Sequence, residues 1–224
     1  MNWKDEVQTI GPDELIEVPD MSIFNQNRDR FTEAGFTVEM MDALFPYLEQ
    51  QMMSILAVFR LASSVCPDGG GRIVEIGSGK GGSMISMHMA KPTATFINID
   101  PFEPYDETSA YGTVKDYKGF KYENFRANMD KFGVGVETIR ERSDIAHTKL
   151  EIGSVDMLFV DGNHTYENCK ADIQNYRSKV TEGGILCGHD FHPRFPGVIK
   201  AVIEEFGPEG YDVMPGSSVW MAMD

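Results

Sequence analysis

From residue 73 onward the chain alternates short apolar runs with amphipathic stretches, and this pattern predicts the fold. Each apolar run has the length and composition of a strand that helices cover on both faces of a sheet. We expect such strands at residues 73–76, 94–99, 136–139, 155–160 and 184–188. Between them, apolar residues recur at helical spacing and predict helices at residues 83–90 and 122–132. Two later helical faces consist of Cys169, Ile173, Tyr176 and Val180, and of Val198, Ile199, Val202, Ile203 and Phe206.

Alternating strands and helices predict a mostly parallel sheet joined by right-handed crossovers. The tail differs, because residues 211–214 and 218–223 flank the turn sequence Pro215-Gly216-Ser217 and so predict a terminal β-hairpin. The expected fold class is therefore α/β: a doubly wound, Rossmann-like sheet with a C-terminal antiparallel hairpin.

The first part of the chain has a weaker pattern. Residues 1–38 are polar and carry the breakers Gly11-Pro12 and Pro19, which predict an irregular arm. A helical stripe follows, formed by Met41, Leu44, Phe45, Leu48, Met52, Ile55, Leu56 and Phe59. We therefore expect an N-terminal arm and helical cap at residues 1–65, and one α/β domain at residues 66–224.

The charge of the chain excludes two classes of partner, nucleic acid and anionic membranes. The chain has 35 acidic and 20 basic residues, a formal net charge of −15, so its field repels nucleic acid and offers no attraction to anionic membranes.

The sequence also indicates where the protein is located. No apolar run is long enough to span a bilayer, and the N-terminus lacks the pattern of a signal peptide. The three cysteines, Cys66, Cys169 and Cys187, are too few and scattered for a disulfide framework, and we expect reduced core residues. These features predict a cytoplasmic protein whose substrate is a small molecule.

A glycine-rich turn, residues 77–82, follows the first predicted strand and precedes a helix. Glycines at positions 77, 79 and 82 let the backbone turn sharply and approach a ligand, and the helix that begins at Ser83 offers free N–H groups. The spacing also satisfies the dinucleotide fingerprint, so a nicotinamide cofactor is an alternative. A phosphate-binding P-loop is excluded because Val74 stands where that motif needs a glycine. A glycine-rich connection without a ligand remains a further alternative.

Of two acidic residues near this turn, Glu75 favours S-adenosylmethionine over NAD. Glu75 lies two residues before the first glycine, where it can accept from the ammonium group of an amino-acid ligand and would repel a pyrophosphate. Asp100 ends the second predicted strand and can accept both hydroxyls of a ribose, which suits either cofactor. The expected cofactor-binding residues in this region are Glu75, Gly77, Ser78, Gly79, Ser83 and Asp100.

A second polar cluster follows the fourth and fifth predicted strands. It contains Asp161, His164, His189 and Asp190. The carboxyl ends of parallel strands meet at one crevice, so these side chains should face the cofactor residues. Asp161, His189 and Asp190 offer oxygen and nitrogen ligands for a divalent cation, with Mg²⁺ or Mn²⁺ expected, and His164 can act as a general base. In the alternative without metal, Asp161 holds the amino group of the ligand and also binds cofactor, while His189 and Asp190 only shape the pocket.

Six stretches, in order along the chain, resemble one branch of the class I S-adenosylmethionine-dependent methyltransferases. They are residues 73–79, 99–101, 159–167, 170–172, 183–191 and 196–198. That branch includes macrolide-sugar O-methyltransferases and cephalosporin-biosynthesis proteins, and its motif has the form DGxH…GHD in this chain. The resemblance runs from about residue 70 to the C-terminus and does not cover residues 1–65 or the loop at 101–120.

The resemblance implies a seven-stranded sheet and a role for each matching residue. Glu75, Gly77, Gly79 and Asp100 would bind the cofactor, and Phe102, Ser143 and Asp144 would lie near its adenine. A metal would bind at Asp161 and Asp190, and His164 would be the base in the sugar-modifying members. The chain departs from the pattern at His189, since those members have two adjacent carboxylates there.

The expected function is methyl transfer from S-adenosylmethionine to a small molecule, with O-methylation favoured, metal assistance, and His164 and Asp161 as catalytic residues. An NAD(P)-dependent oxidoreductase and a metal-dependent hydrolase remain alternatives, whereas a non-catalytic binding module is disfavoured by the adjacent Asp161 and His164. Residues 101–118, which include four aromatic side chains, predict a lid or substrate wall or else a solvated excursion. The sequence is compatible with a homo-oligomer but does not predict one.

Overall fold

The computed structural model describes residues 52–66, 69–103, 105–108, 114–117 and 121–223. The chain divides into two units, Met1–Pro46 and Tyr47–Asp224, and every described residue belongs to the second. The predicted arm at residues 1–38 and the first part of the helical stripe, up to residue 51, lie outside the described residues.

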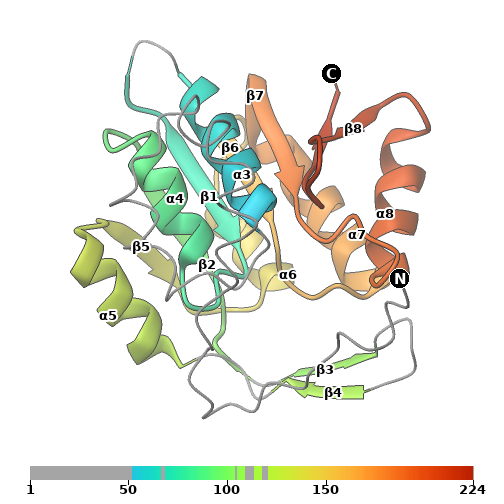
Figure 1. The fold of residues 1–224 in the computed structure, drawn as a ribbon, viewed down its shortest axis with the longest axis horizontal. Helices are drawn as coiled ribbons and strands as arrows, with labels where there is room; N and C mark the ends of the chain where they lie inside the picture. The colour runs from blue at the N-terminus through green and yellow to red at the C-terminus, as the bar shows by residue number, and fades with distance from the viewer. Residues whose placement is uncertain (1–51, 67–68, 104, 109–113, 118–120, 224) are drawn as a thin grey trace. The chain divides into compact units, whose positions relative to one another are not determined.

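The centre of the second unit is a seven-stranded sheet in the order β5-β2-β1-β6-β7-β9-β8 (Figure 1). The strands β1 (Arg72–Ile76), β2 (Thr95–Ile99), β5 (Val136–Ile139), β6 (Val155–Val160) and β7 (Val180–Gly188) are parallel. The C-terminal strands β8 (Tyr211–Val213) and β9 (Trp220–Ala222) pair antiparallel, and β9 also pairs antiparallel with β7. The predicted fold class, including the terminal hairpin, is confirmed.

Alternate residues of the parallel strands face different helices. On one face, Val74 and Ile76 of β1 pack in a core with α7 (Tyr166–Tyr176) and α8 (Pro196–Phe206), which lie side by side in Figure 1. On the other face, Glu75 meets α4 (Gly82–Ala90), and α4 packs on α3 (Met52–Ser64). This arrangement explains why the strands are apolar on both faces. The remaining helical elements are α5 (Tyr122–Phe132), α6 (Ser143–Ala146), η3 (His147–Lys149) and η4 (Arg177–Lys179).

Two segments differ from the prediction. Val180 was expected on a helical face, but α7 ends at Tyr176 and a 3₁₀ turn leads to Val180, which begins β7 and pairs with Val155. The strand thus begins four residues before the predicted 184, because residues 181–184 have no apolar run that would signal it. The region at residues 101–118 also contains strands, β3 (Tyr105–Thr108) and β4 (Val114–Tyr117), which pair antiparallel.

The cysteines are free thiols, as expected, but only two of them are core residues. Cys169 and Cys187 are buried, and burial raises the pKa of the Cys169 thiol to about 12. Cys66 is half-buried and has a φ of 45°, since it lies in the turn after α3 and not in an element of the core. Within the described part of the chain, none of the helices combines the length and apolar character needed to cross a bilayer.

Candidate functional site

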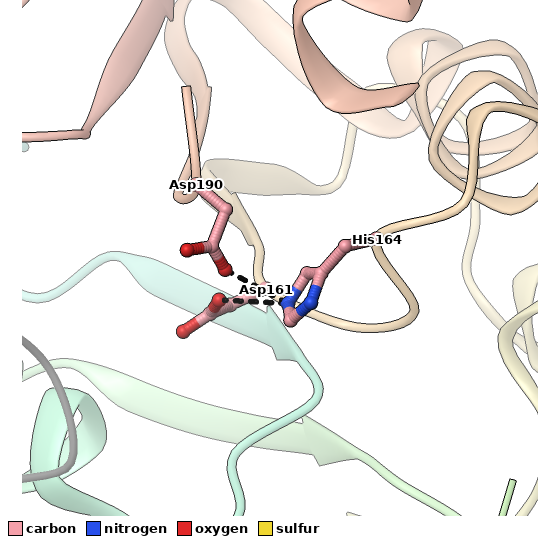
Figure 2. Close-up of side chains that lie close together, drawn as sticks. All are labelled: Asp161, His164 and Asp190. Atoms are coloured by element: carbon pink, nitrogen blue, oxygen red, sulfur yellow. Dashed lines mark ion pairs between the residues drawn. The ribbon is translucent and has the colours of Figure 1, made fainter. Parts of the chain in front are cut away.

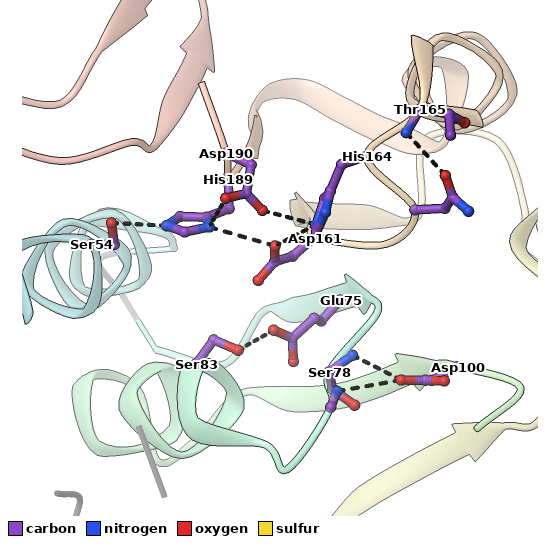
Figure 3. Close-up of polar contacts among 12 residues, drawn as sticks. Ser54, Glu75, Ser78, Ser83, Asp100, Asp161, His164, Thr165, His189 and Asp190 are labelled. Carbon is purple, nitrogen blue, oxygen red and sulfur yellow. Dashed lines mark hydrogen bonds and ion pairs between the residues drawn. The ribbon is translucent and has the colours of Figure 1, made fainter. Parts of the chain in front are cut away.

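Four neighbouring parallel strands end at the same level of the sheet. Ile76 at the end of β1 is in register with Ile99 of β2 and Val160 of β6, and Val160 is in register with Gly188 of β7. The next residues along the chain are Gly77, Asp100, Asp161 and His189. Both predicted groups of site residues therefore lie along one edge of the sheet, with the Asp/His cluster beside Glu75 and Asp100 in Figure 3.

The glycine turn is packed directly against the loop that carries Asp161. Gly77 has a φ of 80°, and a Cβ at this position would stand well under 3.0 Å from the backbone of Asp161 and Gly162. A backbone hydrogen bond holds the same contact, because Asp161 N donates to Ile76 O at 2.8 Å, and a second bond, from Gly77 N to Ile99 O at 2.9 Å, ties the turn to β2. Only glycine satisfies both the conformation and the space.

Glu75 is fully buried beneath the first turn of α4. The hydroxyl of Ser83, also buried, donates to Glu75 Oε1 (Figure 3). Sequence reasoning placed both residues among those that contact cofactor. In the structure, Ser83 contacts Glu75 itself, so it orients this carboxylate at the end of β1.

Asp100 closes the glycine turn through backbone hydrogen bonds. Its Oδ2 accepts from the N–H groups of Ser78 at 3.2 Å and Gly79 at 3.3 Å, and its Oδ1 accepts from Phe102 N at 2.7 Å (Figure 3). Burial raises the pKa of Asp100, and these three donors oppose the rise. A carboxylate has about four acceptor positions, so ribose hydroxyls would share or replace donors that the turn now supplies.

Asn98 is a functional candidate that sequence reasoning missed. It is fully buried on β2, next to Glu75 in the strand register, and its Oδ1 accepts from Ser78 Oγ at 2.8 Å. Ser78 thus presents its hydroxyl to Asn98 and its N–H to Asp100. The available signal was a lone amide inside the apolar strand Phe96-Ile97-Asn98-Ile99.

An aromatic group follows Asp100. Phe102 has a φ of 55°, an uncommon conformation for a side chain of this size, and its ring lies 5.3 Å from that of Tyr122 and 5.4 Å from that of Phe125. The guanidinium of Arg140, just after β5, lies 4.4 Å from the centre of the Tyr122 ring. The strained Phe102 therefore belongs to a wall formed at the ends of β2 and β5.

Ser143 and Asp144, the other predicted adenine residues, begin α6 after β5. The Ser143 carbonyl accepts from the hydroxyl of Tyr176 at 2.9 Å, and the buried Asp172 also bonds Ser143. Burial raises the pKa of Asp172 to about 7. Asp144 is exposed and pairs with Arg142, whose hydrogen bonds lower the pKa of Asp144. Ser143 is therefore anchored to α7, whereas Asp144 interacts at the surface.

The predicted Asp/His cluster is brought together in the structure; Figure 2 draws Asp161, His164 and Asp190, and Figure 3 adds His189. His164 Nε2 lies 2.8 Å from Asp190 Oδ2 and 3.9 Å from Asp161 Oδ1. His189 Nδ1 lies 3.3 Å from Asp190 Oδ1 and 3.6 Å from Asp161 Oδ1. One ligand atom from each of Asp161, His164 and Asp190 lies within 4.8 Å of the other two. Each imidazole therefore faces both carboxylates.

The two carboxyl groups have opposite pKa shifts. Burial raises the pKa of Asp161, against the effect of the neighbouring imidazoles. Burial also opposes ionisation of Asp190, but His164 and His189 outweigh it and hold the pKa of Asp190 well below its usual range. Burial would lower the pKa of His189, yet Asp161 and Asp190 reverse this and raise it. Asp190 is therefore the carboxylate that keeps its charge, and Asp161 is the one that accepts a proton more readily.

Local structure fixes the two histidines. His164 precedes Thr165, the N-cap of α7, and the His164 ring lies 4.6 Å from that of Phe195. Asp190 has a φ of 59°, which turns the chain directly after His189. On the far side of the His189 ring, Nε2 lies 2.9 Å from Ser54 Oγ of α3 (Figure 3). Ser54 was not predicted, because a single serine in an apolar helix carries no signal of a role.

One family profile and two curated relatives match the chain. The family profile described as a methyltransferase domain matches residues 74–191, more than half of the chain. The uncharacterized protein y4gI of Sinorhizobium fredii is 26% identical over 130 residues, and the uncharacterized protein R132 of Acanthamoeba polyphaga mimivirus is 25% identical over 125 residues. The matches cover 56% and 53% of this chain, but they span only 14% and 50% of these curated relatives.

Solved structures share the fold. The calicheamicin methyltransferase CalS11 matches with a TM-score of 0.62 and 15% identity, over 97% of this chain and 99% of that chain. The O-methyltransferase NovP matches with a TM-score of 0.62 and 17% identity, over 77% and 80% of the two chains. The SAH-bound methyltransferase PaMTH1 of Podospora anserina has a TM-score of 0.57 and 13% identity, over 97% and 99%. At these identities the likeness concerns the fold alone.

Proposed function

The chain belongs to the methyltransferase domain family, and on this basis we propose that it transfers a methyl group from S-adenosylmethionine to a hydroxyl group of a small molecule. One observation carries the choice of cofactor. Glu75 and Asp100 stand at the ends of the adjacent strands β1 and β2, on either side of a glycine turn that no side chain could occupy at Gly77.

Each part of this edge suits one part of the cofactor. The carboxylate of Glu75, oriented by Ser83, accepts from the ammonium group, while the turn at Gly77 and Gly79 leaves room for the amino-acid portion. Asp100 accepts from the ribose hydroxyls. The wall around Phe102 covers the adenine, together with the loop that contains Ser143 and Asp144. When bound, the cofactor supplies an electrophilic methyl group on a sulfonium.

The pair of His164 and Asp190 receives the proton of the acceptor hydroxyl. Its geometry supports this role, since the 2.8 Å contact lets the Asp190 carboxylate stabilise the charge that His164 takes up. Nε2–H donates to the ionised Asp190, so the pair as a whole accepts the proton of the hydroxyl and becomes an imidazolium beside a carboxylate. Asp161, 3.9 Å from Nε2, helps to orient the hydroxyl. The acceptor oxygen then bonds the methyl carbon as the carbon–sulfur bond breaks.

A small hydroxylated acceptor is the choice that charge and fold support. The net charge of −15 disfavours polyanionic substrates. NovP, named an O-methyltransferase, shares the fold, and an imidazole–carboxylate pair suits deprotonation of a hydroxyl. The rival nicotinamide cofactor would bring a pyrophosphate towards the buried carboxylate of Glu75, which repels it.

Transfer of a labelled methyl group tests the proposal. The protein should move radiolabel from S-adenosylmethionine to members of a panel of phenols and sugars, and His164→Ala should suppress transfer to all of them. Label on amine or thiol compounds, with none on hydroxyl compounds, would refute O-methylation. Absence of label from every compound, with hydride transfer from NADH instead, would refute the proposed function.

A further inference from the structure

The ring of His189 is held between a serine and two carboxylates (Figure 3). Its Nε2 lies 2.9 Å from Ser54 Oγ, and its Nδ1 lies 3.3 Å from Asp190 Oδ1 and 3.6 Å from Asp161 Oδ1. Ser54 is fully buried, and its oxygen also accepts from Ser218 N at 3.4 Å. His189 is itself buried, so these contacts are sheltered from water.

These neighbours determine where His189 carries a proton. Ionised carboxylates only accept hydrogen bonds, so the nitrogen that faces Asp161 and Asp190 must be a donor, Nδ1–H. In the neutral ring Nε2 then has the lone pair and accepts from the hydroxyl of Ser54, while Ser218 N donates to the same oxygen. In the charged ring Nδ1 is protonated as well. The contacts therefore place a proton on Nδ1 in either form.

A metal ligand needs the opposite arrangement. Imidazole binds a cation through a nitrogen lone pair, and a proton on Nδ1 removes it from the side that faces the carboxylates. The oxygens of Asp190 are also engaged, Oδ1 with His189 and Oδ2 with His164. Spacing alone would admit a cation between Asp161, His164 and Asp190, but the cation would have to break the 2.8 Å contact between His164 Nε2 and Asp190 and compete with the Nδ1–H of His189 for both carboxylates. The donor set of Asp161, His189 and Asp190 therefore does not fit the predicted Mg²⁺ or Mn²⁺.

We infer that His189, held by Ser54, takes the place of a divalent cation between Asp161 and Asp190, so that this protein works without a metal. Ser54 is then a positioning residue, which acts by keeping the Nδ1–H of His189 directed at the carboxylates. The test by methyl transfer rests on the proposed function, whereas metal binding and the protonation of His189 can be measured even if the proposed function is wrong.

Metal binding separates this inference from its rival. Calorimetry with Mn²⁺ and Mg²⁺ should show no specific site in the wild-type protein at millimolar concentrations. His189→Asp creates two adjacent carboxylates and should bind Mn²⁺ at least roughly tenfold more tightly, because charge and oxygen donors favour such cations. The matched control is His192→Asp, which makes the same change at an exposed residue of the same segment and should gain no site. A stoichiometric Mn²⁺ site in the wild type that His189→Ala abolishes would overturn the inference.

Nitrogen NMR tests the role of Ser54. In the wild type, His189 should show a protonated Nδ1 and, when neutral, a lone pair on Nε2. Ser54→Ala should leave Nδ1 protonated, because the carboxylates require it, but should speed exchange of that proton with water as the ring loses its anchor at Nε2. Ser54→Thr, which keeps the hydroxyl, should restore slow exchange. A lone pair on Nδ1 in the wild type would overturn the inference even if His189→Asp fails to fold. Methyl transfer, if present, should survive exhaustive chelation of metal ions. Loss of activity on chelation, with recovery when metal is added back, would also overturn the inference.

Discussion

Gly77 and the backbone of Asp161 lie so close together that a Cβ on residue 77 would stand well under 3.0 Å from the Asp161 carbonyl oxygen. This contact joins the glycine turn, where we place the cofactor, to the loop that carries the Asp/His cluster. Its position explains how one edge of the sheet can align a methyl donor and a proton acceptor, which is the main requirement of a displacement reaction.

Gly77→Ala should therefore damage both stability and cofactor binding. The new methyl group meets backbone atoms that cannot move cheaply, in addition to the strain at a φ of 80°. Gly133→Ala is the matched control, because Gly133 also has a positive φ, 67°, but nothing lies within 4 Å of its added Cβ. The control should lose about 1–2 kcal/mol in urea unfolding, and Gly77→Ala should lose more. Equal losses, with equal affinity for S-adenosylhomocysteine, would argue against the close contact.

Asp100→Ala should weaken binding of the cofactor far more than binding of the acceptor substrate. Each hydrogen bond to a charged acceptor is worth about 1.5–3 kcal/mol, so loss of ribose contacts should raise the cofactor Kd by roughly ten- to a hundredfold per bond. The exposed Glu103→Ala, three residues away, is the control and should leave the Kd unchanged. An unaltered Kd in a folded Asp100→Ala protein would show that Asp100 closes the glycine turn but does not bind the cofactor.

His164 and Asp190 should behave as one unit in kinetics. His164→Ala and Asp190→Asn should each lower kcat about 10²-fold or more with a modest change in KM, as expected when a transition-state interaction is lost. The double variant should cost little more than either single change, because the pair has already been broken. His192→Ala, an exposed histidine of the same segment, should retain activity. Additive losses in the double variant would show that the two residues act separately.

Asp172 should make stability fall as the pH rises. Burial raises the pKa of its carboxyl in the folded protein to about 7, above the ordinary value of 3.8. Between these values the folded state binds more protons than the unfolded state, so the free energy of unfolding decreases with increasing pH. The difference of about three pKa units sets an upper limit near 4 kcal/mol. Asp172→Asn should flatten the pH dependence of urea-unfolding stability between about pH 4 and pH 7, the window that these two pKa values set. The exposed Asp130→Asn should leave that dependence in place. A steep profile in Asp172→Asn would assign the pH effect to other groups.

The sequence predicted the parallel strands and the hairpin because these elements have periodic patterns. The strand ends could be aligned from topology alone, so the proximity of Asp161 and Asp190 followed. The pair β3 and β4 could not be predicted, since Tyr105–Thr108 and Val114–Tyr117 contain no apolar run. Ser54 and Asn98 were missed for another reason. Each acts through one long-range contact, to His189 and Ser78, and no local pattern encodes such a partner.

Calorimetric titration with S-adenosylhomocysteine and with NADH, each against the wild type and Glu75→Gln, tests the central claim most directly. Removal of the Glu75 charge should weaken binding of S-adenosylhomocysteine by at least roughly tenfold, because the ammonium group of the ligand loses one charge-assisted hydrogen bond. We predict a clear isotherm with S-adenosylhomocysteine in the wild type, weaker binding in Glu75→Gln, and no heat with NADH in either. Binding of NADH that strengthens in Glu75→Gln, with no response to S-adenosylhomocysteine, would contradict the account.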